Sequence, residues 1–194
     1  MNGVLTVTLP PPPFSVADAL RYARAGQEDT DTAARLLDAY KAAAPHLSYT
    51  VAYRLFDVVT VGDTVTVGPM QINSRTLSGA FSDCRRAILL AATVGARFDR
   101  LLVREGKLSP ARALLFEAIG AERVEALLDA FERYVTPSLG ALSRRVSPGY
   151  GDLPLPLQKE IFPLLDCERR LGLTLTESLL MSPKKSVTAF IGIK

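Results

Sequence analysis

Several residue types that would point to a familiar chemistry are scarce in this chain. It has one histidine, His46, and two cysteines, Cys84 and Cys167, without the spacing of metal ligands. These three residues cannot complete a zinc site, and a lone histidine at a helix end excludes a Ser/His/Asp triad. The two cysteines could form a disulfide, but two buried free thiols in a reducing compartment are the favoured interpretation.

Longer patterns are missing as well. No Gly-x-Gly-x-x-Gly follows a strand, which excludes a Rossmann-type methyltransferase. No segment approaches the roughly 20 uninterrupted apolar residues of a membrane span. Residues 1–13 have no basic region and no long apolar core, so we expect no signal peptide and a cytoplasmic protein.

Net charge and chain length further limit the classes of protein to which this chain could belong. Lys and Arg exceed Asp and Glu by only three, 23 against 20, and the charges are too evenly spread to predict nucleic-acid binding. With 48% hydrophobic residues among 194, the chain can bury a full core. We expect one domain over residues 1–194, in which 1–13 form a strand and a Pro-rich spacer that could be an appendage.

Hydrophobic periodicity and turn signals divide the chain into short strands and helices. The strand-like segments are 4–9, 49–61, 64–67, 173–176 and 186–193, and the segment 141–146 reads as short and extended. Gly62-Asp63 between the second and third segments predicts a β-hairpin. The helical segments are 16–25, 31–44, 74–86, 97–104, 110–135 and 157–165. Such a mixture without regular βαβ alternation predicts an α+β fold, an antiparallel sheet covered by helices.

Two segments leave alternatives open. The apolar run 87–94 could continue a helix or form a buried strand, since periodicity does not separate the two. Gly120 could divide the helical region 110–135 into two helices. The charged face of that region carries Glu125, Asp129, Glu132 and Arg133.

The hexapeptide Arg145-Val-Ser-Pro-Gly-Tyr150 is the most specific local pattern. Arg145 offers a planar fork to a carboxylate. Gly149 lets the backbone pass close to a flat ligand, and Tyr150 can lie against it. Pro148 pre-sets the turn and extends Ser147, whose backbone N–H and C=O could then meet an adenine edge. Taken alone, the six residues favour an ordinary Pro-Gly turn closed by a core tyrosine.

The order of later segments adds to this pattern. The hexapeptide is followed by Leu173-Thr-Leu-Thr-Glu-Ser178 and by Met181-Ser-Pro-Lys-Lys-Ser-Val187. Together they resemble the activation domain of cobalamin-dependent methionine synthase, and more closely its free-standing single-domain relatives. In that family Arg-x-x-Pro-Gly-Tyr is the S-adenosylmethionine (AdoMet) motif. The resemblance implies a curved antiparallel sheet and favours a strand over 87–94.

The resemblance also implies the roles of individual residues. It assigns the AdoMet carboxylate to Arg145, and the adenosine to Ser147, Gly149 and Tyr150. Glu177 would lie near the sulfonium or amino group, although a capping role fits Glu177 equally. The family's acidic residue for the ligand ammonium has no identifiable equivalent in the first third of this sequence, and the residues after Tyr150 depart from the full-length enzymes.

The function implied is that of an AdoMet-binding accessory protein in methionine biosynthesis, which supports reductive remethylation of oxidised cobalamin. No catalytic side chain is expected, because the nucleophile in the family is reduced cobalamin. The chain has no Asp-x-His-x-x-Gly motif, so cobalamin would come with a corrinoid-binding partner, and electrons from flavodoxin or another donor. The alternative is a corrinoid-protein docking or AdoMet-sensing module without methyl transfer.

For Lys184-Lys185 two interpretations remain, solvation or protection of a strand edge and contact with an acidic partner.

Overall fold

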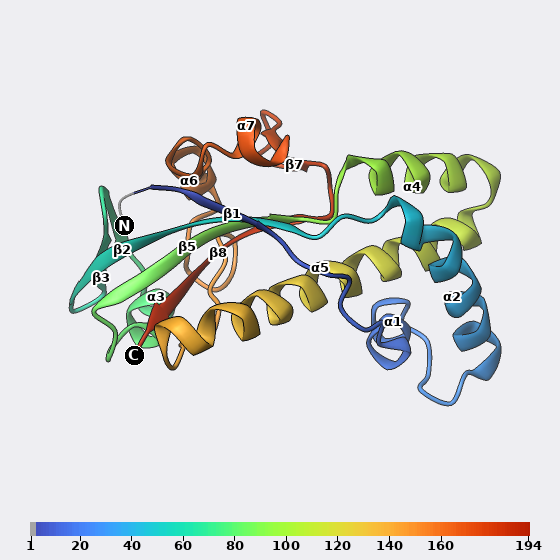
Figure 1. Cartoon of the computed structure of the whole chain (residues 1–194), viewed down its shortest axis with the longest axis horizontal. Helices are drawn as coiled ribbons and strands as arrows, with labels where there is room; N and C mark the ends of the chain where they lie inside the picture. Colours follow the sequence, from blue (N-terminus) through green and yellow to red (C-terminus); the bar gives the residue numbers. More distant parts are fainter. Residues whose placement is uncertain (1–2) are drawn as a thin grey trace.

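A curved antiparallel sheet runs through the computed structural model, which describes residues 3–194 (Figure 1). Its strand order is β4-β3-β2-β5-β8, with β1 paired to β2. The strands are β1 Leu5–Thr8, β2 Thr50–Val61, β3 Thr64–Val67, β4 Met70–Asn73, β5 Arg86–Thr93 and β8 Ser186–Ile193. The predicted α+β class and antiparallel sheet are confirmed, while β4 was not predicted.

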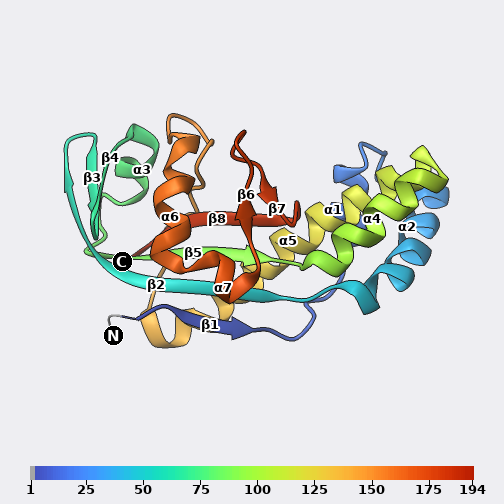
Figure 2. The same cartoon turned by 90° about the horizontal axis from the view of Figure 1, so that it is seen from above.

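The curvature comes from the long strand β2. Its residues 50–57 pair with β5, whereas its last four residues pair with β3. Figure 2 shows β3 and β4 turning away from the plane of β2, β5 and β8. Gly62, at a φ of 59°, makes the predicted turn between β2 and β3. The sheet therefore wraps around the elements packed on its inner side.

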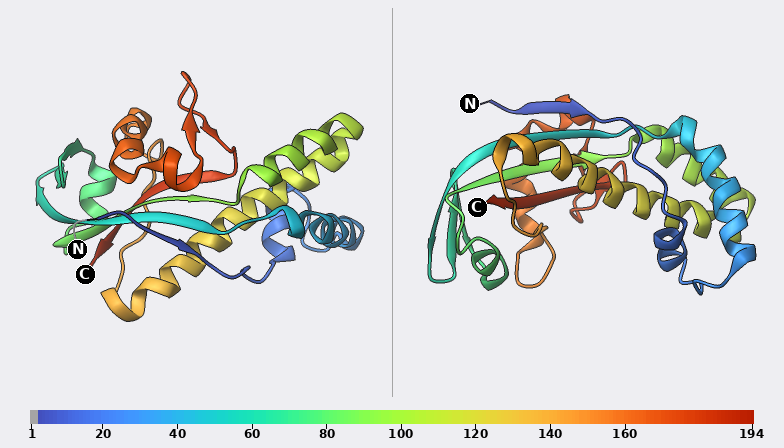
Figure 3. Two further views of the ribbon diagram at one scale, coloured as in Figure 1. Left: turned by 45° about the horizontal axis from the view of Figure 1, so that its top comes forward. Right: turned by 60° about the horizontal axis from the view of Figure 1, so that its bottom comes forward.

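One face of the sheet is covered by the long helix α5 Pro110–Leu139. Three further helices, α1 Val16–Tyr22, α2 Thr30–Ala43 and α4 Ala96–Leu108, pack on α5 beyond the end of the sheet. The views in Figure 3 show α5 crossing the sheet diagonally, with α1, α2 and α4 around its first half. Ile88 and Ile191 from the sheet share a fully buried core with Phe131 of α5, so α5 is the main support of this face.

The other face carries shorter elements. The helices are α3 Arg75–Ala80, α6 Gln158–Leu165 and α7 Cys167–Leu171, and the hairpin strands are β6 Thr174–Leu175 and β7 Met181–Ser182. Two short 3-10 turns, η1 Ala44–His46 and η2 Leu155–Leu157, complete the described elements. Leu89 and Phe190 of the sheet pack here against Ile161 of α6. Alternate residues of β5 and β8 thus enter two separate cores, which is why both strands are largely apolar.

The run 87–94 is a strand. As β5 it pairs with β2 on one side and β8 on the other, and every residue after Arg86 is buried. The helix predicted over 74–86 is correspondingly shorter, because α3 ends at Ala80 and the chain then turns into β5. A strand buried on both faces has no polar period, so the sequence alone did not distinguish it from a helix.

α5 continues through Gly120 and is not divided there. A Cβ at this position would lie 2.7 Å from Cε1 of Phe98 and 2.8 Å from Cε of Lys185. Glycine therefore serves close packing within the helix. Lys185 is largely buried against α5 and pairs with Glu117, whereas Lys184 is exposed. Of this dipeptide, only Lys184 lies on a solvated face.

Both cysteines are free and buried, as favoured from the sequence. Burial raises the pKa of the Cys167 thiol to about 12, so this thiol stays protonated and unreactive.

Within residues 3–194, no helix has the length and apolar character needed to cross a membrane.

Candidate functional site

The segment before the Pro-Gly turn is held as an extra strand along the edge of β8. Ser143 N donates to the Gly192 carbonyl at 2.9 Å, and Val146 exchanges two backbone hydrogen bonds with Phe190 at 2.9 and 2.8 Å. Successive side chains of an extended segment point to opposite faces. Val146 enters the core shared by α3 and α6, so the side chain of Arg145 is directed to the other face, where α5 lies.

The turn itself is a type II β-turn. The Tyr150 N–H donates to the Ser147 carbonyl at 3.0 Å, with Pro148 and Gly149 at the two central positions. Gly149 has a φ of 89°, which the third position of this turn requires and which side chains disfavour. A Cβ there would also approach Leu155 Cδ1 to 3.3 Å. The Pro-Gly pair is thus fixed by backbone geometry.

Asp152 anchors the loop that follows the turn. Its carboxylate accepts hydrogen bonds from Ser74 Oγ at 2.6 Å, Arg75 N at 2.8 Å and Thr76 N at 3.0 Å. These donors, the Ser74 hydroxyl first, hold the pKa of Asp152 well below its usual range. Next to it, Gly151 passes so close to Thr76 that a Cβ would lie 2.5 Å from its Oγ1. The loop is docked on the first turn of α3.

Arg145 faces three carboxylates of α5. Its Nη1 donates to Asp129 Oδ1 and Glu132 Oε1, each at 2.7 Å, and its Nη2 to Glu125 Oε2 at 3.1 Å. The acids are four and three residues apart, which places them on one face of the helix. Burial disfavours the charged guanidinium, but the carboxylates outweigh it and hold the pKa of Arg145 above its ordinary value. One positive and three negative charges leave the cluster with a surplus of two negative charges.

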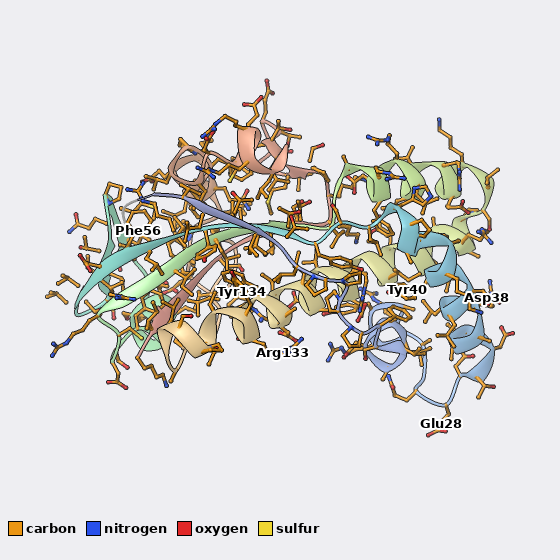
Figure 4. The ribbon with its side chains drawn as sticks, viewed as in Figure 1. Glu28, Asp38, Tyr40, Phe56, Arg133 and Tyr134 are labelled. Atoms are coloured by element: carbon orange, nitrogen blue, oxygen red, sulfur yellow. The ribbon has the colours of Figure 1, made fainter. Side chains whose placement is uncertain are left out.

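The cluster forms one side of a cleft of about 650 Å³. Its other side is the chain from Pro12 to Tyr22, which includes Asp18 of α1. Figure 4 shows Arg133 on the side of α5 that faces away from the sheet. A second hollow of about 410 Å³ shares Asp129 and Arg133 with the cleft and continues toward the end of α5. An open groove therefore follows α5.

The N-terminal wall of the cleft is fixed by a buried ion pair on α5. Arg123 is fully buried, donates twice to the carboxylate of Glu122, and donates to the carbonyls of Pro12 and Pro13 at 2.7 Å each. Glu122 Oε1 in turn accepts the N–H of Ser15, the N-cap of α1, at 3.0 Å. Residues 10–15 are thereby attached to α5 and line the site.

Aromatic rings complete the attachment. The rings of Phe14 and Tyr40 stack with centroids 4.1 Å apart. The Arg123 guanidinium lies 5.2 Å from the first ring centroid and 5.3 Å from the second. Tyr40, labelled in Figure 4, comes from α2. Because the cation is desolvated here, these contacts add to the ion pair.

Comparisons with known proteins agree with this architecture. Residues 142–194, which contain the extra strand, the turn and β8, match a family model. That family is the activation domain of vitamin B12 dependent methionine synthase. The family resemblance drawn from the sequence is confirmed for these residues. A search of curated proteins finds no match.

The fold of the whole chain is also that of a known activation domain. It superposes on a crystal structure of the MetH reactivation domain bound to AdoHcy with a TM-score of 0.71, over 99% of this chain and 78% of that one. The two sequences are 20% identical over this match. At that identity the match concerns the fold, including the N-terminal two thirds of the chain that the activation-domain family model does not cover.

The predicted site residues fall into two groups. Arg145, Ser147, Gly149 and Tyr150 lie in one rigid segment, and Arg145 lines the cleft. The Ser147 carbonyl is engaged by the turn, while its N–H donates to no group among residues 3–194. Glu177 is exposed in the turn of the β6–β7 hairpin, and in Figures 1 and 3 this hairpin lies on the sheet face opposite α5. The structure does not bring Glu177 to Arg145.

Sequence reasoning missed the partners of Arg145. Glu125, Asp129 and Glu132 were read as the solvated face of a helix, because nothing in their local pattern shows which segment packs on them. The available signal was three acids on one face of a helix, where only Asp129 has a basic residue, Arg133, four positions away. Asp152 was read only as a departure from the full-length enzymes, and Arg123 was not singled out.

Proposed function

We propose that the protein binds AdoMet in the cleft between α1 and α5 and supports the reductive remethylation of a corrinoid cofactor held by a separate protein. The observation that carries the proposal is Arg145. This arginine of the Arg-x-x-Pro-Gly-Tyr motif is three-quarters buried, at the edge of a cleft whose other charges are mainly acidic. Such a site suits a ligand with one carboxylate and two positive groups.

The guanidinium still has an edge for the ligand carboxylate. The recorded partners of Arg145 use both hydrogens of Nη1 and one of Nη2. Within residues 3–194, Nε donates to no group, and Nη2 has one hydrogen left. Nε and Nη2 form the lateral fork with which arginine binds a carboxylate through two parallel hydrogen bonds. The ligand can therefore be held without displacing the three acids.

The surplus negative charge suits the rest of AdoMet. Once Arg145 is paired with the ligand carboxylate, Glu125, Asp129 and Glu132 are available to the ammonium and the sulfonium. Asp18 faces the same cleft from α1 and is our candidate for the N-terminal acid that the sequence did not identify. Charges of opposite sign attract strongly at a partly buried site. We therefore expect AdoMet to bind more tightly than AdoHcy, which lacks the positive sulfur.

The turn supplies the contacts for the adenosine. The Ser147 N–H has no partner within residues 3–194 and can donate to a ring nitrogen. Tyr150 is 62% exposed beside it, an unusual position for a large ring and one that a stacked base would cover. Glu177 lies outside this arrangement, so Glu177→Gln is expected to leave AdoMet affinity unchanged.

The chain's contribution to methyl transfer would be positioning and exclusion of water, since the nucleophile would be the partner's reduced corrinoid and not a side chain. AdoMet supplies the methyl group when it is bound, and the partner's corrinoid accepts it. The residues of the cleft orient the sulfonium toward the open groove along α5. A partner that covers this groove would meet the methyl group there, with flavodoxin or another donor providing the electron.

Calorimetric titration of AdoMet into the protein tests the site. We expect Arg145→Gln to lose binding, and Arg144→Gln to keep it. Arg144 is the matched control, because it is the neighbouring arginine but points to α3, where Nη2 lies 3.4 Å from the Thr76 carbonyl. Equal affinity of the two variants, or no binding by the unaltered protein, would refute the proposed site.

A second candidate function rests on the same three acids. Because they already neutralise Arg145, the cleft is stable without a ligand, as a docking module would need. Capture of a corrinoid-loaded methyltransferase separates the two functions. If Arg145→Gln abolishes AdoMet-dependent remethylation while capture persists, AdoMet chemistry is the function. If the unaltered protein captures the partner without any remethylation, the docking function holds.

A further inference from the structure

A second cavity, away from the cleft, is lined almost entirely by basic side chains. It has a volume of about 290 Å³ and lies between η1 and the first half of α4. Its lining consists of His46, Arg97, Arg100, Arg104 and one apolar residue, Leu101. No carboxylate is part of this lining, in contrast to the cleft beside α5.

The cations of this cavity are mostly unpaired. Arg104 donates to Glu105 at 3.0 Å, and Glu105 is also bound by Arg112. For Arg97, Arg100 and His46, the structure records no hydrogen bond or ion pair of the side chain within residues 3–194. The two guanidiniums are exposed and repel each other across one hollow, and an anion between them would relieve this repulsion.

The position on α4 increases this repulsion. Arg97 and Arg100 lie in the first turns of the helix, where the helix dipole favours negative charge. Gly95 at the N-cap contributes no side-chain hydrogen bond. Arg97 and Arg100 therefore oppose the local electrostatic preference, which Asp99 in the same turn follows, and departures from local rules are expected at functional sites.

We propose that this cavity binds a phosphate-class anion, either free phosphate or diphosphate or the phosphate ester of a small molecule. Guanidinium forks match the oxygens of phosphate in pairs, and the N–H of the imidazole adds a further donor. The cavity lies near the lower limit of about 300 Å³ for small-molecule sites, which fits an anionic head group better than a whole nucleotide.

The single histidine makes the test direct. His46 is the only source of imidazole signals in a proton NMR spectrum, so its resonances report on the cavity without assignment. Inorganic phosphate, pyrophosphate and AMP are titrated at constant pH and ionic strength, with chloride as the reference anion. We expect a saturable shift that chloride does not produce, with pyrophosphate at least tenfold tighter than phosphate.

Variants and the choice of anion complete the experiment. Arg100→Gln and Arg97→Gln should each weaken pyrophosphate binding at least tenfold, while Arg35→Gln, an exposed arginine of α2 outside the cavity, should not. AMP binding tighter than phosphate would assign the site to a phosphate ester, and the reverse to the free anion. A shift that does not saturate, or an unchanged dissociation constant in both variants, would overturn the proposal.

Discussion

Two arginines beside the cleft, Arg123 of α5 and Arg145 of the extra strand, are held in opposite ways. Arg123 is fully buried and has a partner on every side, namely Glu122, two backbone carbonyls and two aromatic rings. Arg145 keeps 23% of its side chain exposed, has three acidic partners and leaves one edge of its fork free. The first region is electrically balanced and closed, while the second carries surplus negative charge and opens into a cleft.

The difference separates a structural ion pair from a binding site. A buried pair with every donor satisfied has nothing left to offer a ligand. A partly exposed cation that has unused hydrogen-bond donors and more than one neighbouring carboxylate is arranged to bind a ligand. Substitutions at the two arginines should therefore separate stability from binding.

The largest effect on stability is expected from Arg123→Met. It leaves Glu122 buried without its partner, and breaking one side of a buried pair costs about 3–5 kcal/mol. Urea denaturation measures the loss in the free energy of unfolding. The double variant Glu122→Gln/Arg123→Met should recover part of that loss, because it removes the unpaired charge. A single variant as stable as the unaltered protein would contradict the structural role.

Arg145→Gln should show the reverse pattern. We expect AdoMet affinity to fall by about 100-fold, since a charge-assisted pair contributes about 1.5–3 kcal/mol. The free energy of unfolding should change by no more than about 1 kcal/mol, because the pair is partly exposed to solvent. Calorimetry and urea denaturation on the same preparation give both values. A larger loss of stability than of binding would place Arg145 with Arg123 as a structural residue.

Gly149→Ala tests the turn that carries Ser147 and Tyr150. The positive φ and the contact with Leu155 should cost about 1–2 kcal/mol of stability. AdoMet binding should weaken as well, because the turn is displaced. Gly26→Ala is the matched control, since a Cβ at Gly26 meets no atom within 4 Å and its φ is not in the positive region. Thermal denaturation and calorimetry of both variants decide the outcome.

The smallest expected effect is the contribution of Asp152 to the pH dependence of stability. Its pKa is lowered in the folded protein, so its contribution to stability is complete above the unfolded value of about 3.9 and is lost as the pH falls below it. The stability difference between the unaltered protein and Asp152→Asn should thus be constant from about pH 6 to about pH 4.5 and shrink as the pH falls further toward about pH 3. A difference that stays constant over this range would show that the lowered pKa does not couple to folding.

The sequence predicted the parts of the fold that depend on local signals. The β2–β3 hairpin followed from Gly62-Asp63, and the helix α2 from its apolar spacing. The run 87–94 was not decided locally, because strand pairing on both sides made every position apolar. Gly120 looked like a helix break, yet its role is set by Phe98 and Lys185 from distant segments.

The residues of the candidate site also divide into those that local sequence signals locate and those that only the packing of distant segments locates. Arg145 and its turn could be located because their chemistry is contained in six consecutive residues. Its acidic partners could not, since the docking of an extra strand beside β8 decides which face of α5 it meets. Glu177 was grouped with Arg145 by its order in the chain, but the sheet separates them.

One consequence of α5 concerns motion. The Pro12–Tyr22 wall and the Arg145 wall are far apart in sequence, yet both are bonded to successive turns of this one helix. They should behave as a single cooperative unit, in which neither wall detaches unless the helix unfolds. Amide hydrogen exchange in α1 and at Val146 should then proceed at rates close to those of the middle of α5. A ligand would enter a space already formed, and little conformational entropy would be lost when it binds.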